Sequence, residues 1–116
     1  MALTLYGIKN CDTMKKARAW LDGHGVKYTF HDYKDAGIER AQLTAWCGQV
    51  GWDALLNRGG TTFRKLPPAQ ASGLNETKAI ALMLAQPSLI KRPVLDLGER
   101  ILVGFKTESY AKALAK

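Results

Sequence analysis

The fold of this 116-residue chain is decided by residues 2–31, ALTLYGIKNCDTMKKARAWLDGHGVKYTFH. Residues 2–7 are β-prone and end at a glycine, which predicts a strand. Apolar side chains then recur at helical spacing through residues 11–22, and two glycines follow the expected end of that helix. Residues 26–31 alternate apolar and polar side chains, the period-two pattern of a second strand. The opening third of the chain is therefore predicted to be β-α-β.

The middle of the chain has a different pattern. Residues 37–86 carry apolar side chains at helical spacing, interrupted by glycines and by Pro67 and Pro68. One helix is expected over residues 77–85, with its start marked by Asn75. Three further elements are expected: two strands over residues 94–97 and 101–103, which flank Gly98 as a hairpin, and a helix over residues 108–114.

The predicted order of elements is β-α-β, then helices, then β-β-α. This order matches an α/β thioredoxin-like core, in which a mixed four-stranded sheet with flanking helices carries a helical insertion between its two halves. We expect a single domain over residues 1–116, with the core in residues 1–36 and 87–116 and the insertion in residues 37–86.

Composition excludes several classes of protein. Seventeen Lys and Arg residues against ten Asp and Glu residues give a formal net charge of +7, and 47% of residues are hydrophobic. That content supports one core and argues against disorder, and two cysteines are too few for a disulfide framework. We expect a cytoplasmic protein, because the chain has neither an apolar run of about 18 residues nor the basic and apolar start of a secretory signal.

The basic residues are spread along the chain rather than gathered in one tract. Nucleic-acid binders usually concentrate positive charge on one face or tail, so we expect no direct nucleic-acid partner and no membrane partner. A small anionic substrate fits the charge better. His24 and His31 are too few and too far apart in the sequence to predict a metal site.

Cys11 lies where the first predicted strand delivers the chain to the start of the first helix. A helix N-terminus and nearby cations lower the pKa of a thiol and so increase the fraction of the reactive thiolate. Lys9 and Lys15 are candidates for those cations. The alternative is that Cys11 is a small apolar residue packed under the helix. Its position favours the reactive interpretation.

Three segments of the chain carry a family resemblance. They are LYGIKNCDTMKKARAWL at residues 5–21, YTFHDYK at residues 28–34 and LIKRPVL at residues 89–95. In this order and at this spacing they resemble the arsenate reductase-like ArsC/Spx/YffB family, and most closely its YffB branch. The resemblance implies a thioredoxin-like fold, a nucleophilic cysteine at position 11 and thiol chemistry.

The same resemblance suggests roles for three further residues. In thioredoxin-like proteins a proline like Pro93, which can be held cis, resembles a wall of the cysteine site. By that analogy Arg92 points its guanidinium at the thiolate and clamps an oxyanion or carboxylate bidentately. Arg58 matches the position of a second basic residue in the arsenate reductase relatives. The alternative is that Arg92 and Arg58 are solvated residues and that Pro93 is an ordinary edge-strand proline.

Two departures from the family pattern bear on the substrate. The approach to the cysteine is GIKNC at residues 7–11, without the His-Asn-Pro of the arsenate reductases, and the late arginine of those enzymes is missing from residues 103–106. Arsenate as the true substrate is therefore doubtful. Met14 stands where many Spx-type regulators have the second cysteine of Cys-x-x-Cys. Cys47 is expected in the core, which leaves a single reactive thiol and an external thiol to resolve it.

The leading hypothesis is a thiol-dependent reductase with Cys11 as nucleophile. Arg92, Arg58 and Lys9 would bind an anionic substrate such as glutathione or a glutathionylated molecule, with Pro93 and Lys15 in support. No bound cofactor is expected, and glutathione would be the co-substrate. One alternative is a Spx-like, non-enzymatic adaptor or regulator that binds RNA polymerase, and another is an arsenate reductase.

Overall fold

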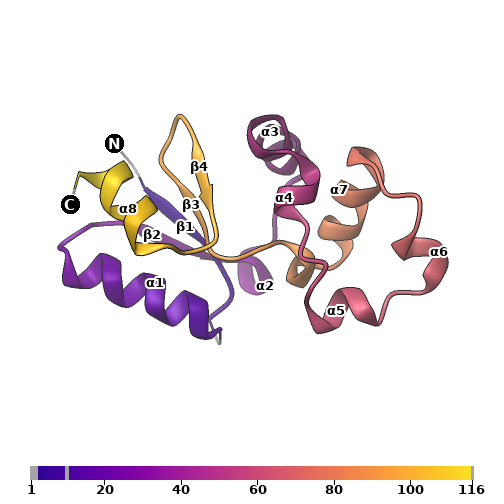
Figure 1. Ribbon diagram of the computed structural model, residues 1–116, viewed down its shortest axis with the longest axis horizontal. Coiled ribbons are helices and arrows are strands. Elements are labelled where there is room, and N and C mark those ends of the chain that lie inside the picture. Colours follow the sequence, from indigo (N-terminus) through magenta and orange to yellow (C-terminus); the bar gives the residue numbers. More distant parts are fainter. Residues whose placement is uncertain (1–2, 10, 116) are drawn as a thin grey trace. The chain divides into compact units, whose positions relative to one another are not determined.

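Four strands form one mixed sheet in the computed structural model, which describes residues 3–9 and 11–115. The strand order is β2-β1-β3-β4 (Figure 1). The strands are β1 (Thr4–Gly7), β2 (Thr29–Asp32), β3 (Val94–Asp96) and β4 (Ile101–Val103). β1 pairs with β2 in parallel and with β3 antiparallel, and β3 pairs antiparallel with β4. The α/β thioredoxin-like core with a mixed four-stranded sheet is thus confirmed.

The helices follow the predicted order, with several single turns among them. They are α1 (Asp12–Gly23), α2 (Tyr33–Ala36), α3 (Arg40–Val50), α4 (Trp52–Leu55), α5 (Thr61–Arg64), α6 (Pro68–Ala71), α7 (Glu76–Ala85), the 3-10 helix η1 (Pro87–Leu89) and α8 (Thr107–Leu114). The chain forms two compact units. The first unit runs up to Ala36 and resumes at Arg92, and the second comprises Gly37–Lys91.

The second strand begins later than predicted. The alternation over residues 26–31 suggested pairing from Val26, but the backbone N–H of Val26 donates to Leu21 O at 2.9 Å and closes the end of α1. Gly25 supplies the left-handed conformation of that turn, with φ of +67°. Pairing with β1 begins at Thr29, the residue opposite Thr4.

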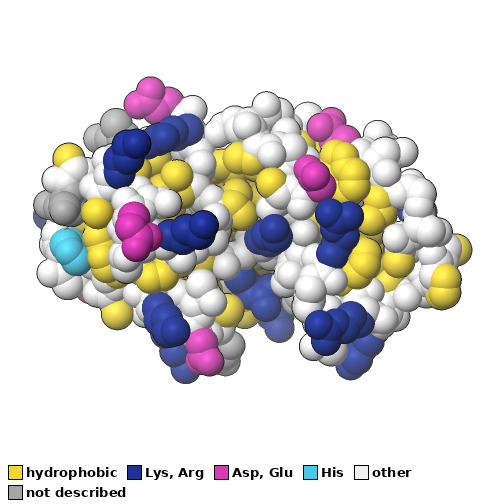
Figure 2. All heavy atoms as spheres, in the orientation of Figure 1, with side chains coloured by type: hydrophobic (Ala, Val, Ile, Leu, Met, Phe, Trp, Pro, Cys, Tyr) yellow, Lys and Arg dark blue, Asp and Glu magenta, His cyan; other side chains and the backbone are white. Residues whose placement is uncertain are grey.

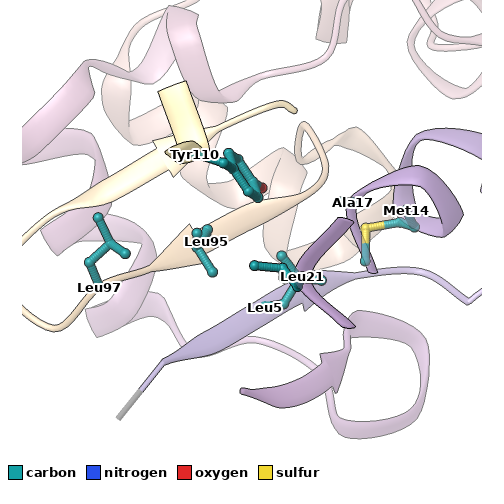
Figure 3. Packing of buried hydrophobic residues seen from close by; sticks show 7 residues of the cluster. All are labelled: Leu5, Met14, Ala17, Leu21, Leu95, Leu97 and Tyr110. Atoms are coloured by element: carbon teal, nitrogen blue, oxygen red, sulfur yellow. The ribbon is translucent and has the colours of Figure 1, made fainter. Parts of the chain in front are cut away.

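The first unit has its core on one face of the sheet. Leu5 and Leu95 are opposite each other on neighbouring strands, so their side chains share that face. Helices α1 and α8 both cover it, and Figure 3 shows the buried side chains that meet there. The cluster consists of Leu5, Met14, Ala17, Leu21, Leu95, Leu97 and Tyr110.

Close approach of β1 to α1 depends on Gly7. A Cβ atom added at Gly7 would lie 2.2 Å from the Sδ atom of Met14, which is fully buried. The missing side chain therefore lets the first turn of α1 pack directly on the end of β1, immediately before the loop that leads to Cys11.

Strand β2 lies at the edge of the sheet and is partly covered by a side chain of α1. The guanidinium carbon of Arg18 lies 4.4 Å from the ring centroid of Phe30. Its Nε donates to the Tyr28 hydroxyl at 3.2 Å. Arg18 thus covers aromatic side chains next to the open edge of the sheet.

The second unit is built from helices. Its buried side chains include Leu43, Trp46 and Cys47 from α3. Asn75 begins α7 as predicted, because its side chain accepts a hydrogen bond from the backbone N–H of Lys78 at 2.9 Å. An antiparallel bridge pairs Leu56 with Ile90 inside this unit.

On the face seen in Figure 2, Lys and Arg side chains form separate groups among apolar and uncharged ones.

Within residues 3–9 and 11–115, no helix is long and apolar enough to cross a membrane.

Candidate active site

The strand directions bring three parts of the first unit to one end of the sheet. β1 ends at Gly7, and its parallel neighbour β2 ends at Asp32 directly opposite. β3 runs the other way and pairs Val94 with Tyr6, so Arg92 and Pro93 precede it at this same end. The peptide bond between Arg92 and Pro93 is cis. Cys11 follows the end of β1, and this sheet end therefore places Arg92 near the thiol.

Cys11 is the N-cap residue of α1. Its backbone is extended, with φ of −132° and ψ of 129°, and its carbonyl oxygen accepts from Lys15 N at 3.0 Å. The side chain is partly buried and packs against the core cluster of the first unit. The thiol makes no side-chain capping hydrogen bond to α1. The first backbone N–H groups of the helix nevertheless point toward its N-terminus, and their dipoles favour negative charge on the thiol there.

The surroundings of Cys11 favour the thiolate. Burial raises the pKa of the thiol. The backbone N–H groups of Met14 and Thr13, together with the hydrogen-bonding and positively charged side chain of Arg92, lower this pKa by more than burial raises it. The net result is a Cys11 pKa below its ordinary value. This agrees with the predicted direction. A lowered pKa increases the fraction of the thiol that is present as the nucleophilic thiolate.

An aromatic group that was not predicted lies toward the same end of the sheet. The ring of Tyr6 lies 4.7 Å from that of His31 and 6.2 Å from that of Tyr33. Tyr33 is 1% exposed, and its hydroxyl has no hydrogen-bond partner in the described part of the chain. Burial and the neighbouring Tyr6 raise the pKa of Tyr33, and the charge of Arg92 opposes that rise. The charge of Arg92 thus acts on this aromatic group as well as on Cys11.

The predicted cations take different positions. Lys9 Nζ lies 3.0 Å from Asp35 Oδ2 in an exposed ion pair, and this contact raises the Lys9 pKa. The side chain of Lys15 is exposed, one turn into α1. Arg92, rather than either lysine, is the cation that lowers the pKa of the Cys11 thiol. The proposed roles of Lys9 and Lys15 remain predictions.

Asp32 was missed by sequence reasoning and is the one carboxylate among the buried polar side chains described, at 8% exposed. It accepts from the backbone N–H of Lys9 at 3.1 Å and from that of Lys34 at 2.7 Å. Its position follows from the pairing of Asp32 with Gly7 across the sheet, which no pattern in the single sequence indicates.

Two sequence candidates lie in the second unit. Arg58 is exposed and its guanidinium carbon lies 5.7 Å from the ring centroid of Trp52, so its part in binding a substrate remains a prediction. Cys47 is 4% exposed, and burial together with Glu76 raises its pKa, which favours the unreactive thiol. Cys47 is therefore a core residue, as predicted.

No group of three or more His, Cys, Asp or Glu side chains that could hold a metal ion occurs within the described ranges.

Comparison with known proteins agrees with this architecture. A solved structure described as YFFB protein is 65% identical, with a TM-score of 0.96, and the match covers 97% of this chain and 99% of that one. The solution structure of an arsenate reductase (ArsC) related protein from Brucella melitensis is 52% identical, with a TM-score of 0.78 and coverage of 100% and 97%. A Haemophilus influenzae protein described as uncharacterized is 41% identical over 113 residues, which cover 97% of this chain and 99% of the relative. The model of the ArsC family matches residues 6–113, and this chain therefore belongs to the ArsC family.

Proposed function

We propose that this protein is a thiol-dependent reductase in which Cys11 is the nucleophile and glutathione is the resolving thiol. The observation that carries the proposal is the convergence of the first amide groups of α1 and the Arg92 side chain on a partly exposed thiol. Such surroundings stabilise a thiolate, the form that attacks disulfide sulfur.

The reaction needs two exchange steps. In the first, the Cys11 thiolate attacks the glutathionyl sulfur of a glutathionylated substrate, the substrate S–S bond breaks, and the substrate leaves as a thiolate that takes a proton from water. Cys11 is then disulfide-bonded to glutathione. In the second, a glutathione thiolate attacks that bond, so that oxidised glutathione leaves and the Cys11 thiolate is restored. In sum, the mixed disulfide and one molecule of reduced glutathione give the free substrate thiol and one molecule of oxidised glutathione.

An external resolving thiol is favoured by the positions of the sulfur atoms. Met14 occupies the place of a second thiol one turn after Cys11, and a thioether cannot form a disulfide. Cys47 is buried in the second unit with a raised pKa. Neither sulfur is a ready partner for Cys11.

An anionic substrate is favoured by Arg92. Its planar guanidinium can donate two parallel hydrogen bonds to a carboxylate, and glutathione carries two carboxylates. Arg58 and Lys9 are proposed as further contacts. Arsenate is less well supported, since the histidine and the late arginine of the arsenate reductases are absent from the sequence.

The test combines intact mass spectrometry with a turnover assay. After exposure to oxidised glutathione, we expect wild type and Cys47→Ala to gain one glutathionyl group and Cys11→Ser to gain none. The turnover assay uses a mixed disulfide of glutathione and a small thiol as substrate, reduced glutathione as the resolving thiol, and oxidised glutathione as the measured product. In it, wild type and Cys47→Ala should turn over and Cys11→Ser should not.

Other outcomes would replace the proposal. An internal disulfide between Cys11 and Cys47 would replace the external thiol. RNA polymerase captured equally well by wild type and Cys11→Ser, in a protein with no turnover, would favour the adaptor instead.

A further inference from the structure

Asp32 has an unusual position for a carboxylate. It is 8% exposed, and a buried charge is costly unless hydrogen bonds or opposite charges compensate it. Its hydrogen bonds to the protein come from backbone N–H groups on two separate segments.

The two carboxylate oxygens act on different segments. Oδ1 accepts from Lys34 N at 2.7 Å, within the first turn of α2, which starts directly after Asp32. This is the bond of an ordinary helix cap. Oδ2 accepts from Lys9 N at 3.1 Å, 23 residues earlier in the chain and two residues before Cys11.

A cap alone does not require a carboxylate. Ser, Thr and Asn also cap helices, but a single acceptor oxygen serves only one of the two segments. The second oxygen of Asp32 holds the backbone of the loop that leaves β1, at the point where Gly7 and Asp32 are already paired across the sheet. The start of α1 is thereby attached to the end of β2.

We infer that Asp32 is a positioning residue that holds the loop before Cys11 so that the thiol stays against the first amide groups of α1 and against Arg92. It acts through the backbone of Lys9 and does not touch the substrate. The inference deepens the proposed function, because it rests on Cys11 as the reactive group.

A neighbouring carboxylate provides the matched control. Asp35 also contacts Lys9, but it pairs with the exposed ammonium at 3.0 Å and leaves the backbone of Lys9 untouched. Replacing Asp35 removes a negative charge from the same loop contact without releasing the Lys9 N–H group. Asp32→Ala and Asp35→Ala therefore separate the backbone anchor from the surface ion pair.

The experiment measures the pH dependence of Cys11 alkylation by iodoacetamide, followed on the Cys11 peptide by mass spectrometry. We expect Asp32→Ala to move the midpoint upward by about half a unit or more, toward the value of about 8.5 for a free cysteine. Asp35→Ala should leave the midpoint within about 0.2 units of wild type. Thermal unfolding of each variant shows whether it is folded, and this readout is independent of the midpoint.

A folded Asp32→Ala protein with the wild-type midpoint would overturn the inference, even if its melting temperature fell, because a merely structural role lowers stability alone. If Asp32→Ala does not fold, Asp32→Ser decides the question, since its short side chain keeps one acceptor oxygen for the adjacent cap of α2 and leaves none for Lys9 N. A raised midpoint in that variant supports the inference and an unchanged one overturns it. Neither result depends on glutathione turnover, so failure of the proposed function would be seen separately.

Discussion

Replacement of Arg92 by alanine tests the central contact of the site. The Arg92 side chain lowers the pKa of the Cys11 thiol through hydrogen bonding and its positive charge. A hydrogen bond to a charged group is worth about 1.5–3 kcal/mol, and because Arg92 is half-buried we take the lower end of that range. Since one pKa unit corresponds to roughly 1.4 kcal/mol, Arg92→Ala should raise the pKa of Cys11 by about one unit. The Thr13 and Met14 amide groups remain, so part of the stabilisation persists.

The expected rate change is smaller than the change in thiolate fraction. A rise of one pKa unit leaves about tenfold less thiolate at a pH below both midpoints, but the more basic thiolate is about threefold more nucleophilic. Alkylation at such a pH should therefore slow about three- to fourfold, while the maximal rate at high pH rises. The assay is the full pH profile of Cys11 alkylation.

Two variants serve as controls for this measurement. Arg92→Lys keeps the charge and should give an intermediate midpoint. Arg100→Ala removes an exposed cation from the turn between β3 and β4, at the opposite end of these strands, and should leave the midpoint unchanged. If Arg92→Ala and Arg100→Ala both give the wild-type midpoint, the reasoning that links Arg92 to the thiolate is wrong.

Three further predictions concern stability. Gly7→Ala should lower the free energy of unfolding by about 1–3 kcal/mol, because the added Cβ meets Met14. The loss of stability caused by Gly7→Ala should be smaller in a Met14→Ala background. Purely additive losses in a double-mutant cycle measured by denaturant unfolding would contradict this. Asn75→Ala should cost about 1 kcal/mol by loss of the α7 cap while Asn75→Asp costs less, and equal midpoints of chemical unfolding in all three proteins would be evidence against the cap. Burial raises the pKa of Asp32, but the amide groups of Lys34, Lys9 and Asp35 and the Lys9 charge hold it below its usual range. The resulting stabilisation of the fold is fully present above the unfolded-state pKa of about 3.9 and is lost as pH falls through the lower folded-state pKa. The difference in melting temperature between wild type and Asp32→Ala should therefore narrow below about pH 4. A constant difference would show that ionisation of Asp32 does not contribute to stability.

Local patterns predicted the elements that are long or regular. The hairpin around Gly98 and the helix after Asn75 are where the sequence indicates them, because turn residues and caps act over a few positions. The single turns α5 and α6 were not predicted individually, since four residues are too short to show a helical period.

The site could be predicted only in part. Cys11 stood out by its place after the first strand, and Arg92 through the resemblance to a family. Asp32 and Tyr33 belong to the quoted segment YTFHDYK, but no local pattern marks them. Their positions depend on the pairing of Gly7 with Asp32 and on the burial of Tyr33, which are contacts across the fold. Such contacts leave no periodic signal in a single sequence.

The contact of Arg18 with Phe30 has a consequence for solubility. An open strand edge next to uncovered aromatic side chains invites a strand from another molecule to pair there, which is a route to aggregation. The outer strand has only four residues, and exposed Lys27 and Lys34 flank it. Because Arg18 lies across Phe30, it places a further charge where an incoming strand would need an apolar surface. This charge disfavours self-association of the protein at the β2 edge of the sheet.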